Sequence, residues 1–322
     1  MKHRNAKLAL IATLVLAPAL SAASRAGEGV DLRLKLQPGQ VLRYESSSQQ
    51  DMDIDMDGQK VTMKNRQEGV SAFKVVSVDD RGNFRMELTG ERLKMSMQSP
   101  AMSMEYDSTK LDDQEKQKEK SLLGKFTALM ATARFTATLS PSGQVVESSG
   151  MAELQKQLLE AFPEAAGQIK MMTGKETEEA LWAAFCQRPQ EHKTPGDTWV
   201  TEKNAMGMMQ MKMTSRLEKV VDGQPVVVPA GLEIAFGDFA KKGDPANPFA
   251  ALAKNMKATK TELTGSTTLD AASGVVRQSD SKMVLDYGLT VPGSDKAVSY
   301  HIVQTATSRL LPAAGTGPQS RK

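Results

Sequence analysis

The amino-acid sequence predicts a mainly β fold with some helix (α+β), in which amphipathic helices pack on an antiparallel curved sheet or sandwich. Short segments that alternate apolar and polar residues, separated by turn residues, follow one another from Leu32 onward. This pattern is typical of antiparallel strands. Helical periodicity is concentrated in the middle of the chain. Similar motifs recur in both halves, so we expect the sheet to be built from two diverged repeats.

The chain begins with a pattern typical of a secretory signal peptide. Basic residues precede an apolar run from Leu8 to Leu20, and small residues offer cleavage after Ala23 or Ala26. The run is too short to span a bilayer comfortably, and no cysteine nearby could accept a lipid. We therefore expect residues 1–26 to be removed and the mature chain to be periplasmic or secreted, with no integral membrane span.

Two hairpins in the first half give the clearest strand signals. Alternating residues in 73–78 and 84–88 flank the turn sequence 79–83, and a second pair of short strands flanks the turn that starts at Pro141. Further hairpin turns are predicted at Asp222-Gly223, Ala272-Ser273-Gly274 and Pro292-Gly293-Ser294.

Apolar residues at three- and four-residue steps predict three helical stretches, which we expect to cover the sheet. These stretches are Leu122, Leu123, Phe126, Leu129 and Met130; then Leu154, Leu158, Phe162 and Ile169; then Ala180, Leu181, Ala184 and Phe185.

Two pairs of similar motifs occur in the same order in the two halves. The segment 38–42 (PGQVL) resembles 195–199 (PGDTW), and 138–146 (TLSPSGQVV) resembles 268–276 (TLDAASGVV). Proline and glycine punctuation can recur for steric reasons alone. The consistent order nevertheless favours a duplication.

These motifs divide the mature chain into two predicted units. The first β-rich repeat, with the central helices, covers 27–190, and the second covers 191–310. A small, polar, proline-containing tail at 311–322 is predicted to be disordered. The motifs leave open whether the two repeats share one sheet or form two.

The same motifs resemble an exported bacterial family, the domain-of-unknown-function family numbered 6263. The resemblance rests on Pro38-Gly39-Gln40, on Tyr106-Asp107-Ser108 and on the hairpin from Leu139 to Val145. It implies paired β-rich modules and export. It implies no activity.

The charge of the mature chain excludes a global basic field for nucleic acid. Lys2, Arg4, Lys7 and Arg25 lie in the signal segment, which leaves 37 of the 41 basic residues against 38 acidic ones. Cys186 is the only cysteine, so no disulfide can form within the chain, and its place in a helical apolar pattern favours a buried thiol.

An aspartate-rich segment resembles the start of a calcium-binding loop. Asp53, Asp55, Asp57 and Gly58 match its first positions, but the twelfth position, where a bidentate acid is needed, is Lys64. A hairpin that turns at Asp57-Gly58 is the better interpretation. We expect no metal site and no cofactor.

Catalytic arrangements are poorly supported. The sequence contains no Gly-x-Ser-x-Gly, no His-Glu-x-x-His and no complete phosphate-binding loop. His301 alternates with apolar neighbours in a predicted strand, and His192 lies in a polar segment. We therefore expect that the protein is not an enzyme, with a hydrolase that uses an atypical site as a remote alternative.

Methionines provide the remaining functional signal. Met209, Met211 and Met213 alternate, so in a strand they project to one face. Thioethers bind Cu(I), fill cores or line adaptable apolar surfaces. The sequence predicts an exported non-enzymatic binding protein of the bacterial cell envelope for an apolar small molecule, with these methionines, Phe126 and Leu158 as its lining. The alternative is a structural or assembly protein of the envelope that binds a protein partner.

Overall fold

The computed structural model describes residues 29–100, 102–110, 122–182, 185, 188–205, 209–237, 253–290 and 297–312. The predicted signal segment, Cys186, the turn at 292–294 and the tail from 313 lie outside the described residues.

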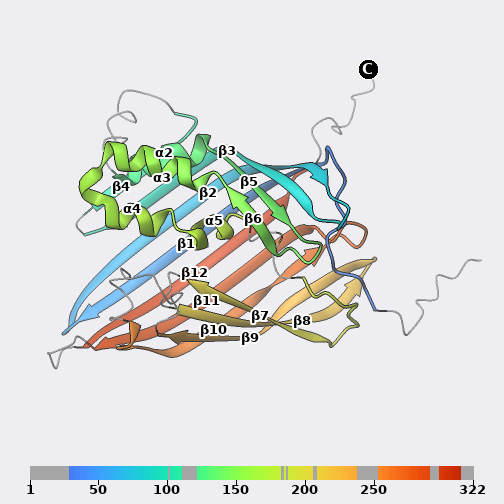
Figure 1. Ribbon diagram of the computed structural model, residues 1–322. Helices are drawn as coiled ribbons and strands as arrows, with labels where there is room; N and C mark the ends of the chain where they lie inside the picture. Colours follow the sequence, from blue (N-terminus) through green and yellow to red (C-terminus); the bar gives the residue numbers. More distant parts are fainter. Residues whose placement is uncertain are drawn as a thin grey trace, which may run out of the picture.

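Twelve strands form one antiparallel sheet, which confirms the mainly β prediction (Figure 1). Their order across the sheet is β6-β5-β3-β2-β1-β12-β11-β10-β9-β8-β7, and β4 pairs with β3 off this path. The sheet is open, with β6 and β7 at its edges. The strands are β1 (Val41–Met56), β2 (Gln59–Val78), β3 (Phe84–Ser99), β4 (Met102–Asp107), β5 (Arg134–Leu139), β6 (Val145–Ser149), β7 (Thr198–Ala205), β8 (Met209–Val221), β9 (Gln224–Phe236), β10 (Met256–Leu269), β11 (Val276–Thr290) and β12 (Ala297–Leu310).

The described hairpin turns lie where the sequence predicts them. The turn at Asp57-Gly58 joins β1 to β2, and the turn at Asp222-Gly223 joins β8 to β9. Both residues of each turn have positive φ, between 49° and 83°. Two-residue hairpin turns of this type match the right-handed twist of the strands. The aspartate-rich segment is therefore a hairpin strand.

The two halves have the same strand order. It is β6-β5-β3-β2-β1 in the first and β11-β10-β9-β8-β7 in the second, with β12 between β1 and β11. The amide of Gly39 donates a hydrogen bond to the carbonyl of Val75 at 2.8 Å, and that of Gly196 donates to Leu217 at 2.8 Å. Each acceptor lies on the second strand of its half. The halves share one sheet, and the duplication itself stays a prediction.

Helices cover one face of the sheet in front of β1, β2 and β3 (Figure 1). They are α2 (Leu122–Thr132), α3 (Met151–Ala161), the 3-10 helix η1 (Pro163–Ala165), α4 (Ala166–Met172) and α5 (Lys175–Ala180). The second predicted stripe does not form one helix, because Pro163 lacks the amide hydrogen that would continue α3. Of the third predicted stretch, only Ala180 lies in a helix, because α5 ends there; Leu181 and Phe185 lie in a turn, and Ala184 lies outside the described residues.

The core lies between these helices and the sheet. Phe73 is at its centre, with ring centroids 5.9 Å from Tyr44, 5.9 Å from Trp182 and 4.9 Å from Phe185. Leu269 of the second half belongs to the same buried cluster. Because strands from both halves contact one cluster, the sheet curves around it, and the helix-covered face is the concave face.

The segment 29–36 crosses one end of the sheet. Leu32, Leu34 and Leu36 are buried in the core cluster. The amide of Leu34 donates to the carbonyl of Pro141 at 2.7 Å, and the amide of Lys35 donates to Ser273 at 2.9 Å. The segment therefore connects a hairpin turn of the first half to the equivalent turn of the second.

Leu34→Ala is expected to lower the free energy of unfolding by about 2 to 5 kcal/mol, through lost burial and the cavity left behind. Denaturant titration measures the change. Val76→Ala, at a residue 45% exposed on β2, is the control and should have little effect. A loss below about 1 kcal/mol for Leu34→Ala would show that the segment contributes little to the core.

Asp31 makes the stability of this segment depend on pH. Hydrogen bonds from the side chain of Arg33 hold the pKa of Asp31 well below its usual range. A depressed folded-state pKa stabilises the fold above the unfolded value near 4, and this contribution is lost as the pH falls below it. Asp31→Asn should therefore cost about 1 kcal/mol or less at pH 7, because Arg33 is partly exposed. In urea titrations from pH 7 to pH 2, the difference from the native chain should shrink toward zero.

Candidate functional site

The pairing register determines which side chains share the concave face. Directly opposed residues of antiparallel strands project to the same side. Tyr44 of β1 packs under the helices, so the alternate residues that follow it, such as Met52, also face the concave side. Met52 pairs with Met63 on β2 and with Ile302 on β12. Repeating this assignment from each strand to its paired neighbour identifies the concave-side residues of every strand.

The concave face is almost free of charge. Among the strand residues that have a direct partner in the described register, Lys203 on edge strand β7 is the only charged residue on this side. The opposite face carries acids and bases along most strands, for example Asp53, Lys64, Glu68 and Arg92. The sheet is therefore strongly amphipathic across its whole width.

The described helices cover this face toward one end of the strands. Toward the other end, where β1 turns into β2, apolar side chains are half-buried and lie outside the core cluster of described residues. We name this region the open apolar face. Its residues are Met52, Ile54, Val61, Met63, Met95, Met97, Met209, Met211, Met213, Ile234, Tyr287 and Tyr300.

Three aromatic rings lie close together at the open apolar face. Two of them belong to this face, and the third lies beside it. Tyr287 and Tyr300 stack with their centroids 4.5 Å apart and their planes at 8°, and Phe236 lies 5.3 Å from Tyr287. Burial raises the pKa of Tyr287 to about 12, so this phenol is neutral at physiological pH. The region is apolar enough to penalise a charge.

The predicted lining residues separate into two groups. Met209, Met211 and Met213 lie together on β8, opposite Phe236, Ile234 and Leu232 of β9. Leu158 is fully buried in the helix-covered core, and Phe126 packs against that core. The structure thus brings the methionines together on the open apolar face and places Phe126 and Leu158 at the covered end.

Other residues of the open apolar face were not predicted as lining. Met52 and Ile54 had a readable signal, because they alternate with aspartates in a strand. The sequence contains no such signal for Tyr287 and Tyr300, because their stacking depends on the pairing of β11 with β12.

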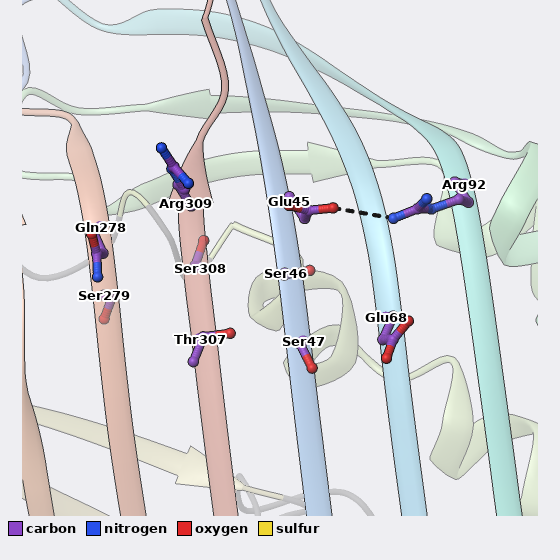
Figure 2. Close-up of a pocket in the computed structure, with 10 residues that line it drawn as sticks. All are labelled: Glu45, Ser46, Ser47, Glu68, Arg92, Gln278, Ser279, Thr307, Ser308 and Arg309. Atoms are coloured by element: carbon purple, nitrogen blue, oxygen red, sulfur yellow. Dashed lines mark hydrogen bonds and ion pairs between the residues drawn. The ribbon is translucent and has the colours of Figure 1, made fainter.

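Two hollows lie elsewhere in the described structure. One, of about 370 Å³, is lined by residues of β11, β12, β1, β2 and β3 (Figure 2). Its charged residues include Glu45 and Arg92, whose side chains are joined by a 3.2 Å ion pair on the convex face. The other, of about 560 Å³, lies beside α2, η1 and α4. Neither contains a residue of the open apolar face.

The described ranges hold no group of three or more His, Cys, Asp or Glu side chains placed to bind a metal ion. His301 pairs with Asp286 on the convex face. In the same part of the chain, no helix is both long and apolar enough to cross a membrane.

Solved structures share only a distant likeness with this chain. Lipovitellin, from a study of lipid–protein interactions, has a TM-score of 0.40 and 12% identity; the match covers 88% of this chain and 27% of the lipovitellin chain, so this chain spans about a quarter of that protein. DynF from the dynemicin pathway of Micromonospora chersina has a TM-score of 0.21 and 8% identity, with 89% and 88% covered. A DUF1329 family protein from Desulfovibrio piger has a TM-score of 0.16 and 11% identity, with 87% and 88% covered.

No curated protein sequence matches the chain significantly. A protein family described as "Family of unknown function (DUF6263)" matches residues 81–276. The matched range includes the motifs at Tyr106 and Leu139, whereas Pro38 lies before it. Because the match covers more than half of the sequence, the chain belongs to this family, as its motifs predicted.

Proposed function

We propose that this protein is an exported, non-enzymatic binding protein that holds an apolar small molecule on the open apolar face. The observation that supports this most is the separation of charge. Among the paired strand residues described, the concave side carries one charged residue, Lys203 at an edge, while the convex side carries charged residues along most strands. Beyond the described helices, this apolar face lies outside the core cluster. An apolar ligand would use it.

The energetics of such binding are favourable. Apolar burial contributes roughly 25 cal/mol per Å², so an occupant that covers about 300 Å² of this face gains on the order of 7 kcal/mol before the entropic cost of association. Half-buried side chains such as Met63 and Met211 still have area to lose. The gain is large enough for a bound small molecule.

The composition of the face favours a flexible ligand. Methionine is unbranched and polarisable, so it adapts to irregular apolar shapes. Methionines lie on β1, β2, β3 and β8, on both sides of the sheet centre. An acyl chain or a similar flexible hydrocarbon fits such a surface better than a rigid polar metabolite. Export, which rests on the amino-terminal pattern of the sequence, would place the protein in the cell envelope or outside the cell.

The test measures binding of N-phenyl-1-naphthylamine, an apolar dye whose fluorescence rises in an apolar environment. The native protein should enhance the fluorescence. Met211→Glu places a carboxylate on the open apolar face and should weaken binding by at least about tenfold, because a charge in apolar surroundings is costly. Gln210→Glu adds the same charge to the same strand on the convex face and should leave binding unchanged.

Thermal melting of both variants checks that they remain folded. Native mass spectrometry of protein purified from its own envelope fraction should detect a bound small molecule. The proposal is wrong if the native protein does not enhance the dye, or if both glutamate variants weaken it equally. A stoichiometric bound protein in place of a small molecule would support the alternative of an envelope assembly protein.

A further inference from the structure

Three carboxamides lie at one border of the open apolar face, on its central strands. Gln50 on β1 pairs directly with Asn65 on β2 and with Gln304 on β12. All three are half-buried and project to the concave side, since Gln50 is two residues before Met52 on the same strand. They form a continuous row across the strands that lie side by side in the middle of Figure 1. We name them the carboxamide row.

The row has unused hydrogen-bonding capacity. The Oδ1 atom of Asn65 is buried and has no hydrogen-bond partner. Within the described part of the chain, no side-chain hydrogen bond joins Gln50 or Gln304 to another group. Buried polar atoms are normally paired, so an unpaired one calls for an explanation such as a bound molecule.

The row has apolar neighbours at both ends and on one side. Asn65 pairs on its other side with Met97, and Gln304 pairs with Met283. One step along the strands in one direction lie Met63, Met52 and Ile302, and one step in the other direction lie Gln67, Ser48 and Ala306. A molecule that contacts the row would therefore meet polar groups at the row and hydrocarbon at both its ends and on the side of the open apolar face.

The charge of the face restricts what the row can bind. No cation lies among the paired residues of the concave side except Lys203 on β7, and five strands lie between β7 and β1 in the sheet. A buried carboxylate or phosphate without a cation is strongly disfavoured. A neutral hydroxyl can donate to a carboxamide oxygen and accept from a carboxamide N–H.

We propose that the carboxamide row binds the polar group of a neutral amphiphile, whose hydrocarbon lies on the methionines around the row. This inference rests on the proposed function and specifies its ligand class. The polar group is an uncharged hydroxyl or amide, and the hydrogen atom it donates satisfies Asn65.

Displacement of N-phenyl-1-naphthylamine compares three probes of equal chain length: 1-monooleoylglycerol, which is neutral and carries hydroxyls; oleate, which is charged; and 1-octadecene, which is a hydrocarbon. The native protein should bind 1-monooleoylglycerol more tightly than either other probe. Asn65→Leu should reduce its preference over 1-octadecene by about three- to tenfold, the contribution of one or two net hydrogen bonds. Affinity for 1-octadecene should stay the same or rise.

Stability separates a binding role from a structural one. Because Asn65→Leu removes an unpaired buried polar atom, the melting temperature should stay the same or increase while the preference falls. Gln50→Met should also lower the preference without lowering the melting temperature. It is the variant to use if Asn65→Leu does not fold. Gln278→Met, at an exposed position on the convex face of β11, is the matched control and should change nothing.

Three results would overturn the inference while the proposed function survives: equal affinity for 1-monooleoylglycerol and 1-octadecene, tighter binding of oleate, or an unchanged preference in both row variants. If no probe displaces the dye and the dye itself does not bind, the proposed function fails as well.

Discussion

The curvature of the sheet depends on one set of contacts, the burial of leucines from the segment 29–36 and of aromatic rings around Phe73 in a single cluster. Large antiparallel sheets twist and curl, but twist alone does not create an inside. Here Leu34 is hydrogen-bonded to one hairpin turn and Lys35 to the equivalent turn of the other half. Both halves are thereby held to the same apolar centre. The concave face exists because these contacts draw the halves together.

Local sequence was sufficient for much of the architecture. Alternation and turn residues predicted the hairpins at Asp57-Gly58 and Asp222-Gly223, and helical periodicity predicted that Leu154 and Leu158 face the sheet. The side on which Met209, Met211 and Met213 lie together also follows from alternation alone. These features depend on neighbours within a few residues, which is the range that sequence patterns describe.

The features that could not be predicted from the sequence depend on contacts between segments that are far apart in the chain. Nothing in the alternation of residues 41–56 indicates that β12 will lie beside β1, so the meeting of Gln50 with Gln304 could not be foreseen. The choice of one sheet over two was open for the same reason. Phe126 and Leu158 were assigned to a ligand lining because an apolar helix face looks the same in sequence whether it covers a core or a cavity. Only burial distinguishes the two.

The pairing of β1 with β12 has a consequence for assembly. β1 and β12, the first and last strands along the chain, are neighbours at the centre of the sheet. The edge strands β6 and β7 come from the middle of the chain. The central seam therefore cannot form until residues 297–310 are available, although each half can form its hairpins earlier. Such long-range closure slows folding, because a large loop must be ordered before its contacts stabilise it. The concave surface is therefore continuous from one half to the other only once β12 lies beside β1.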